Sequence, residues 1–463
     1  MENKKIGIIT EEERRAALQC LRTAVHCGAS AARVSLSKSV MDSISMLNGK
    51  VDKVTHCADR SIFMYIWADG RYGTFSTNSF DRAELEDFIV KAVDTVRMLA
   101  PDSFRSLPNK ERCAKDALTG NELGLVDLAY AGLEAEDRLS AAKRASLMAS
   151  GKGGFEGVSD KGAAYKIISE ECEYSDGIDD SITADSQGFE GRHIETSYSV
   201  CTEMTIADAE GNRYSGYYWT ASPESGKLEI EECSSEALRK AVMQIGPKPS
   251  RSGQRKMIVD RTVASRLVAP ILNALDSNSI QQKNSFLADM LGKQVFSPEL
   301  TIMDSARTPG MTGSRLYDAE GVATVERPIV KDGVVMLNWT TTYMANKMGI
   351  EPTCDGPSRP VVCSLKTTEK DVSLENIMAQ CRNGVYVTGF NGGNCNPVTG
   401  DFSYGIEGFT IKDGHIGHPV KEMLITGNMI DLWKNLIAAG TDARSCAKWS
   451  IPTLAFDSVN FSA

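Results

Sequence analysis

Alternating segments joined by tight turns constrain the fold of the N-terminal part of this chain more than any other feature. Apolar and polar residues alternate over residues 32–36, 40–47, 61–68 and 71–76, the pattern of strands that bury one face. Between them, Asn48-Gly49 and Asp69-Gly70 are typical of two-residue hairpin turns. One helical segment precedes these strands and another follows them. The order therefore predicts an α+β fold, with an antiparallel sheet and flanking helices, rather than alternating parallel units.

The two flanking helices have clear start signals. Thr10 and Glu13 fit a capping box, in which each side chain bonds the backbone N–H of the other residue. Gly28 is placed to end the helix that they begin. Asp81 is the expected N-cap of a second helix over residues 82–99.

Composition shifts divide the chain into three predicted regions. Strand patterns dominate again from 157 to 218, and a Pro-, Gly- and Ser-rich stretch at 246–253 has no periodicity, as in linkers. Strands then resume toward the C-terminus. We predict an N-terminal α+β domain over 1–110, a central sheet and helix domain over 111–246, and a β-rich C-terminal domain over 247–463.

The charge balance and the absence of long apolar runs limit the compartment and the partners. The 463 residues carry a net charge of −10, and the pI is about 5.3, so direct nucleic-acid binding is not expected. No apolar run approaches the ~20 residues that span a bilayer, and the N-terminus has no secretory pattern. Twelve scattered cysteines without a CxxC pair are typical of reduced thiols. We expect a cytoplasmic protein without membrane contact.

A search for catalytic patterns finds only isolated candidates. None of the five histidines lies in an HExxH or HExxxH motif, the helical spacings that bind zinc beside a general base. His415 and His418 are interpreted as residues of an exposed hairpin turn. Cys395, in a Gly/Asn-rich loop, and Cys446, near the C-terminus, are candidate nucleophiles only if a histidine lies beside them. The carboxylates Asp176, Asp179 and Asp180 are interpreted as a solvated acidic loop.

Residues 257–296 read as a strand followed by a core helix. Val263, Leu267, Ile271 and Leu275 recur every four residues, which places them on one helical face. Pro270 lies within this stripe and is expected to kink the helix.

Several blocks, in order along most of the chain, resemble the TldD/PmbA family, whose members are also called modulators of DNA gyrase. The blocks are residues 70–79, 100–102, 195–199, 285–287, 291–294, 318–321, 329–334, 396–403 and 425–428. The resemblance implies one of two kinds of member. TldD-type proteins are zinc metallopeptidases with an HExxxH helix and a later cysteine ligand. PmbA/TldE-type proteins lack the two histidines and act as partners of the first kind.

The resemblance places the zinc motif on the core helix. Counting back from Ser285, the positions of its two histidines and its glutamate correspond to Leu267, Leu272 and Val268, and Cys446 corresponds to the later cysteine. Since zinc needs about three protein ligands, we expect no catalytic residue and no metal in this chain, with zinc held by a TldD-like partner.

The resemblance thus predicts a PmbA/TldE-like, non-catalytic subunit of a cytosolic metalloprotease that acts on short or unfolded peptides, as in peptide maturation and antitoxin turnover. Its partner would be a TldD-like subunit or a second copy of itself. Three alternatives stay open: a self-sufficient peptidase built on Cys395 or Cys446, a regulator that contacts DNA gyrase, and a homodimer that binds peptides without cleaving them.

Overall fold

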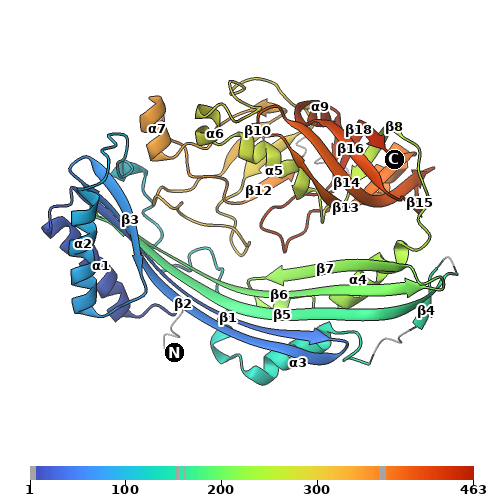
Figure 1. The fold of residues 1–463 in the computed structure, drawn as a ribbon, viewed down its shortest axis with the longest axis horizontal. Helices are drawn as coiled ribbons and strands as arrows, with labels where there is room; N and C mark the ends of the chain where they lie inside the picture. The colour runs from blue at the N-terminus through green and yellow to red at the C-terminus, as the bar shows by residue number, and fades with distance from the viewer. Residues whose placement is uncertain (1–6, 152–155, 161, 364–371) are drawn as a thin grey trace. The chain divides into compact units, whose positions relative to one another are not determined.

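The computed structural model describes residues 7–151, 156–160, 162–363 and 372–463. They form two compact units (Figure 1): Met1–Met243 with Thr308–Thr324, and Gln244–Arg307 with Val325–Ala463. The predicted α+β class is confirmed. Where the sequence predicted three regions there are two units, because β1 (Ala31–Leu47) pairs with β5 (Ala164–Asp185) across the predicted division at 110.

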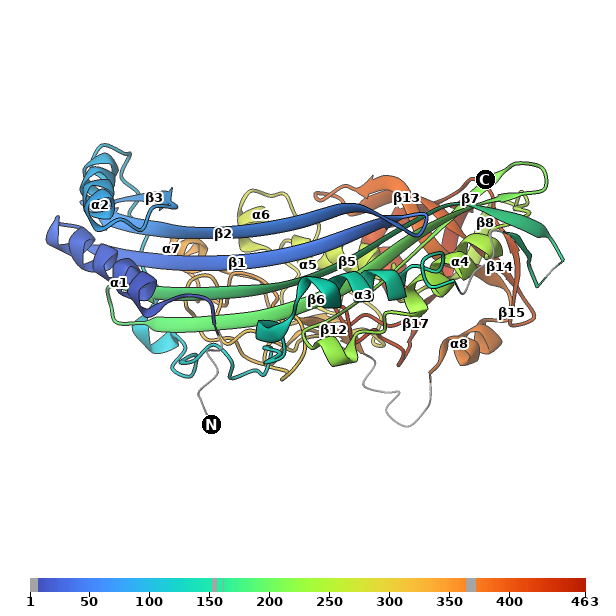
Figure 2. The ribbon, with the colours of Figure 1, turned by 90° about the horizontal axis from the view of Figure 1, so that it is seen from below.

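The first unit is built on one antiparallel sheet in the order β3-β2-β1-β5-β6-β7, with β4 paired to β5. Its other strands are β2 (Lys50–Ala68), β3 (Arg71–Thr77), β4 (Glu156–Val158), β6 (Glu190–Asp208) and β7 (Arg213–Ser222). The strands are much longer than the sequence patterns indicated (Figure 2). Residues 32–36 and 40–47 were predicted as two strands but belong to the single strand β1. Since β1 is paired on both sides, its backbone bonds continue through the polar residues between them.

Four helices cover one face of this sheet. They are α1 (Glu11–His26), α2 (Arg82–Val96), α3 (Ala135–Ala145) and α4 (Glu232–Met243). Val34 and Leu36 pack with α1 and α2 at one end, while Ile44 packs with α3 at the other. All three have the same parity on β1 and therefore share one face. The predicted capping box of Thr10 with Glu13 and the N-cap Asp81 are both present.

A segment from the middle of the chain completes the first unit. Residues 308–324 return to it between two stretches of the second unit. The backbone N–H of Gly310 donates to the Leu123 carbonyl at 2.8 Å. The rings of Phe189 and Tyr317 pack edge to face, 5.5 Å apart. The local sequence pattern of residues 308–324 does not indicate that this segment belongs to the first unit.

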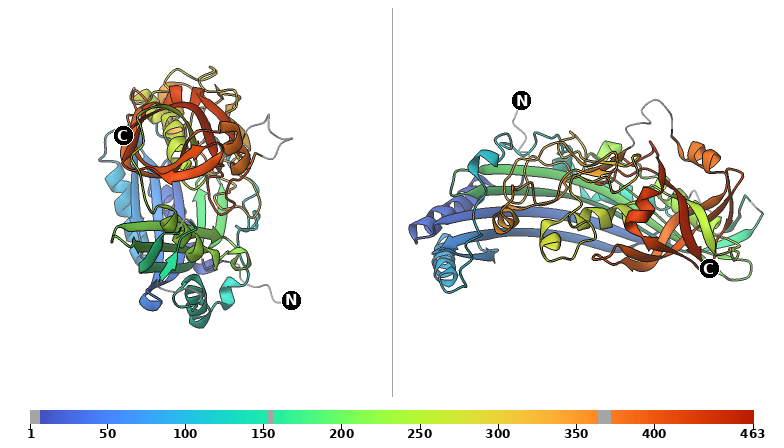
Figure 3. Two further views of the ribbon diagram at one scale, coloured as in Figure 1. Left: turned by 90° about the vertical axis from the view of Figure 1, so that its right-hand side faces the viewer. Right: turned by 90° about the horizontal axis from the view of Figure 1, so that it is seen from above.

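The second unit contains a small barrel. Strands β13, β8, β18, β16 and β14 are neighbours in that order, and β13 also pairs with β14, so the five close on themselves (Figure 3). Strand β15 extends the sheet beyond β14, and β17 pairs with β18. The bounds are β8 (Gly253–Val259), β13 (Gly384–Cys395), β14 (Asp401–Lys412), β15 (His415–Pro419), β16 (Met423–Asn428), β17 (Leu436–Ala439) and β18 (Leu454–Ser462).

A second sheet and five short helices make up the rest of the described part of the second unit. The sheet has the order β11-β10-β9-β12. Its strands are β9 (Thr301–Asp304), β10 (Arg327–Lys331), β11 (Val334–Val335) and β12 (Pro360–Cys363), and the helices are α5 (Ser265–Ala274), α6 (Ser277–Gln281), α7 (Thr342–Met348), α8 (Leu374–Cys381) and α9 (Met429–Lys434). Among the described residues, no helix is both long and apolar enough to cross a bilayer.

Candidate functional site

Helix α5 is the element on which the resemblance places the zinc motif. Asp260 accepts from the Thr262 backbone N–H at 2.8 Å and so orders the turn that leads into the helix. The helix itself begins only at Ser265 and continues through Pro270. At its other end, the hydroxyl of Ser285 donates to the Ala274 carbonyl at 2.5 Å. This bond satisfies one of the carbonyls that a helix C-terminus leaves open.

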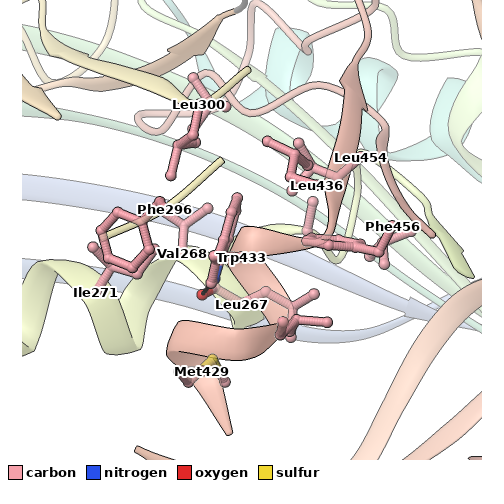
Figure 4. Close-up of a cluster of buried hydrophobic side chains, with 14 of the residues drawn as sticks. Leu267, Val268, Ile271, Phe296, Leu300, Met429, Trp433, Leu436, Leu454 and Phe456 are labelled. Carbon is pink, nitrogen blue, oxygen red and sulfur yellow. Dashed lines mark hydrogen bonds between the residues drawn. The ribbon is translucent and has the colours of Figure 1, made fainter. Parts of the chain in front are cut away.

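The inner face of α5 is part of the core of the second unit. Leu267 and Val268 are fully buried, and Leu272 is 3% exposed. Figure 4 shows Leu267 and Val268 with Trp433 in one apolar cluster. Two tryptophan indoles donate hydrogen bonds to the backbone of α5. The indole of Trp433 donates to the Leu267 carbonyl at 3.3 Å, and that of Trp339 donates to the Leu272 carbonyl at 3.1 Å. The three positions that the resemblance assigned to the zinc motif therefore point into a closed core.

The outer face of α5 lines a pocket of about 270 Å³ within the second unit. Arg266 and Asn273 are exposed on this face, and Ala269 and Pro270 are half-buried. The remaining lining residues are Ala274, Ser279, Asn284, Phe286, Asn394, Cys395, Pro397 and Tyr404. The pocket is thus walled by amides, apolar groups and one thiol around a single guanidinium.

The guanidinium of Arg266 is held by two contacts. Its Nη2 donates to the Gly393 carbonyl at 2.8 Å, and its Cζ lies 4.9 Å from the centre of the Tyr404 ring. Among the described residues Arg266 has no carboxylate partner. Tyr404 is fixed in turn by stacking on Phe402 with ring centres 5.5 Å apart. Burial raises the pKa of Tyr404, so its phenol stays neutral beside the cation.

A bulge in β13 brings Cys395 to the pocket. The pairing of β13 with β14 shifts between Asn391 and Asn394. Gly393, at φ +76°, approaches β14 so closely that a Cβ would lie 1.9 Å from the Ser403 carbonyl oxygen. Burial raises the pKa of the Cys395 thiol, and Asp401 raises it further. No histidine lines the pocket, so the thiolate that a cysteine nucleophile needs is disfavoured.

The other sequence candidates lie elsewhere. Cys446 is half-buried in the loop between β17 and β18 and does not line the pocket. His415 and His418 were predicted in an exposed turn, but both belong to β15, because Asp413-Gly414 alone makes the turn. Nδ1 of His418 lies within hydrogen-bond distance, 2.8 Å, of the Thr410 hydroxyl.

The acidic loop predicted from three aspartates is wrong, because Asp176, Asp179 and Asp180 lie in β5. Asp176 and Asp180 are almost fully buried. Arg138 donates two 2.8 Å bonds to Asp176, and Arg192 donates bonds of 2.9 and 2.6 Å to Asp180. The charges of Asp176 and Asp180 are therefore each paired with an arginine within the first unit.

The donors on α5 do not fit zinc. A catalytic zinc site takes three ligands from imidazole, thiolate and carboxylate. The outer face of α5 offers a guanidinium, an amide and two apolar residues, and Cys395 is the only thiol in the pocket. Over the whole described part of the chain, no group of three or more His, Cys, Asp or Glu side chains is placed to hold a metal ion.

Sequence profiles of two domains match this chain. The PmbA/TldA metallopeptidase C-terminal domain matches residues 252–463, and domain 1 of the same metallopeptidases matches residues 32–96. A crystal structure from Bacteroides thetaiotaomicron VPI-5482, described as a candidate modulator of DNA gyrase, has 37% sequence identity and a TM-score of 0.91, over 98% of this chain and 100% of that one. The chain belongs to the PmbA/TldD metallopeptidase family.

Other members of this family extend the comparison. Metalloprotease PmbA of Escherichia coli O157:H7 is 26% identical over 414 residues, which cover 89% of this chain and 87% of that protein. TldE from Thermococcus kodakarensis has a TM-score of 0.78 at 18% identity, over 97% of this chain and all of that one. At that identity the second comparison shows the shared fold alone.

Apart from Cys395, the residues that line the pocket were not predicted from the sequence. Arg266, Ala269 and Asn273 alternate with the apolar stripe of the helix, so the stripe itself marks them as the opposite face. Asn394 and Tyr404 reach the pocket only through the bulge and the pairing of β13 with β14. No local pattern indicates that juxtaposition.

Proposed function

We propose that this chain is a PmbA/TldE-like, non-catalytic subunit that works with a zinc-bearing TldD-like metallopeptidase in the cytoplasm. The observation that carries the proposal is the composition of α5. Its inner face is closed by Leu267, Val268 and Leu272, and its outer face presents Arg266 and Asn273. Neither face offers the set of ligands with which zinc activates water.

The pocket on α5 suits a peptide end rather than a hydrolytic centre. Arg266 is a fixed cation without a carboxylate partner in the described residues, and guanidinium binds carboxylates through two parallel bonds. Phe286 and Pro397 give the same pocket an apolar wall. We infer that it holds the C-terminal carboxylate of a short or unfolded peptide, which the TldD-like partner cleaves.

Reconstitution tests this function. The chain and a TldD-like chain from the same cell are purified separately and then combined with a quenched peptide. Hydrolysis is expected only in the mixture, and a mixture whose TldD-like chain lacks its motif histidines is expected to be inactive. Equal hydrolysis by the chain alone would overturn the proposal.

A cysteine peptidase built on Cys395 is a second candidate, because this thiol lines the pocket. The raised pKa of the thiol and the absence of histidine from the lining argue against it. Cys395→Ala, with Cys446→Ala as the matched control outside the pocket, separates the two. Loss of hydrolysis in the Cys395 variant alone would favour the cysteine mechanism.

Regulation of DNA gyrase is a third candidate, since similar structures from two bacteria carry that description. A pull-down of gyrase subunits by the purified chain tests it. Stoichiometric capture at physiological salt would favour this role.

A further inference from the structure

A second pocket, of about 250 Å³, lies in the second unit and shares no lining residue with the pocket on α5. Its lining residues come from β8, β14, β16 and β18, and from α9 with its C-cap Asn435. Three of them, Thr426, Gly427 and Asn428, belong to the block 425–428 that carries part of the family resemblance. The pocket on α5 gives this block no role.

A bulge in β18 shapes one side of the second pocket. The pairing of β18 with β8 shifts between Phe456 and Val459, so the residues between them leave the regular ladder. The Asp457 backbone N–H donates to the Asn435 carbonyl at 2.9 Å, and the Asn435 side-chain amide donates to the Ser458 carbonyl at 3.4 Å. The bulge is therefore tied to the end of α9, and both Ser458 and Asn435 line the pocket.

The floor of this pocket is apolar. Phe402, Leu432 and Val459 line it and are only 5%, 4% and 3% exposed. Gly427 lies beside the Phe402 ring, since a Cβ on this glycine would be 3.3 Å from Cζ of that ring. Because Gly427 has no side chain, the edge of the ring stays open to the pocket.

The rim of the pocket carries uncharged polar side chains. Thr426, Asn460 and Gln254 are register partners on three adjacent strands. The Asn460 amide donates to the Thr426 hydroxyl at 2.8 Å, and the Ser458 hydroxyl donates to Oε1 of Gln254 at 3.0 Å. These bonds orient the amides. Within the described part of the chain, Nε2 of Gln254 and the Oδ1 atoms of Asn435 and Asn460 have no hydrogen-bond partner. The rim therefore offers both donors and acceptors to a ligand.

The charges around this pocket favour a neutral ligand. None of its described lining residues is a lysine or arginine, so a phosphate or carboxylate finds no cation to bind. The one carboxylate, Asp431, is exposed and lies 3.5 Å from Nζ of Lys434. The four barrel strands that line the pocket are each paired on both sides, so no strand edge is open here to a peptide main chain.

A sugar ring has the chemistry that this pocket lacks. Its hydroxyls donate and accept hydrogen bonds, as amides do, and its C–H faces are apolar. Small-molecule sites combine an apolar wall with a few oriented polar groups. We propose that the pocket binds a neutral sugar ring, with its hydroxyls on the amides of the rim and one C–H face on Phe402, Leu432 and Val459. This goes beyond the proposed function, which concerns the pocket on α5.

Sugar binding is tested on the full chain with four probes: glucose, galactose, mannose and N-acetylglucosamine. Binding is detected by saturation-transfer NMR and quantified by titration. At least one probe is expected to bind, with the strongest transfer to its ring C–H protons, because these protons meet the apolar floor. The 6-phosphate of the probe that binds is expected to bind at least ten-fold more weakly than the neutral sugar.

Two variants and a matched control locate the binding. Asn460→Ala removes one rim amide and is expected to weaken binding at least ten-fold, about 1.4 kcal/mol at 25 °C. Gly427→Ala places a methyl group against the Phe402 ring and is expected to weaken it too, with thermal unfolding as the check that each variant folds. Asn391→Ala is the control, because Asn391 is an exposed amide on β13 of the same barrel, bonded to Glu407 at 2.8 Å and outside the pocket. It is expected to leave sugar binding unchanged.

Three results would overturn the proposal. The first is that none of the four sugars binds the wild-type chain. The second is that Asn460→Ala binds as tightly as the wild type, or that Asn391→Ala loses as much affinity as Asn460→Ala. The third is that the 6-phosphate binds as tightly as the neutral sugar.

Discussion

The two faces of α5 give the most discriminating prediction about the site. A histidine pair on the inner face, Leu267→His with Leu272→His, occupies positions that the sequence resemblance assigns to the zinc motif. A pair on the outer face, Ala269→His with Asn273→His, lies one helical turn apart on the side that lines the pocket. The structure predicts that the inner pair destabilises the second unit and that the outer pair creates zinc affinity.

The magnitude follows from burial. Leu267 is fully buried and Leu272 is 3% exposed. Removing a buried leucine side chain costs about 2–5 kcal/mol, and an imidazole left without a partner costs about 1–3 kcal/mol more. For the pair, the loss is roughly 5 kcal/mol or more, which is comparable to the whole stability of a domain. The outer pair removes no core packing, and its cost is expected to stay within about 1 kcal/mol.

Guanidinium unfolding followed by tryptophan fluorescence measures the stability difference, because Trp433 and Trp339 bond the inner side of α5. Zinc affinity is measured by competition with a chelating dye. The outer pair is expected to bind zinc with Cys395 as third ligand, and adding Cys395→Ala is expected to weaken that binding. A stable inner pair that binds zinc, with no binding by the outer pair, would refute this assignment of the two faces.

Three further predictions concern single positions. Arg266→Ala is expected to weaken binding of peptides with a free C-terminal carboxylate at least ten-fold in fluorescence anisotropy, with no effect on amidated peptides, and an equal loss for both would contradict the carboxylate assignment. Gly393→Ala is expected to lower the thermal midpoint of unfolding, because the new Cβ would collide with the Ser403 carbonyl. Gly392→Ala is the control: Gly392 has φ +66° but open space around the position of a Cβ, so this variant is expected to lower the midpoint less. Burial raises the pKa of Glu13, but bonds from Thr10 and Lys38 outweigh it and leave that pKa below its usual range. The stability that the ionised Glu13 contributes is present above the unfolded-state pKa and is lost as the pH falls through the folded-state pKa. Glu13→Gln is therefore expected to make the free energy of unfolding depend less on pH in the acid range. An unchanged pH profile of stability would contradict this.

Local signals predicted the parts of the fold that depend on neighbouring residues. The capping box of Thr10 with Glu13, the N-cap Asp81 and the turns at Asn48-Gly49 and Asp69-Gly70 were all found as expected. Strand lengths were underestimated, because a strand paired on both sides tolerates polar residues that break its pattern. The return of residues 308–324 to the first unit depends on a backbone hydrogen bond to Leu123 and on packing against Phe189, which local sequence does not encode.

The site was predicted only in part. The apolar stripe located a core helix, and the resemblance located the zinc motif on it. The elements that pack against α5 decide which of its sides faces the pocket. Trp433 lies against the inner face, and the β13 bulge lies at the outer face. Asn394 and Arg266 line the same pocket although more than a hundred residues separate them in the chain, so no spacing in the sequence marks them as neighbours.

The central claim is that this chain supplies no catalytic zinc. The most direct test is the metal content of the purified full chain, measured by mass spectrometry after dialysis against zinc, together with its hydrolysis of unfolded peptides. Far less than one zinc per chain and no hydrolysis above the buffer rate are expected. One tightly held zinc per chain with peptide hydrolysis that a chelator abolishes would contradict it.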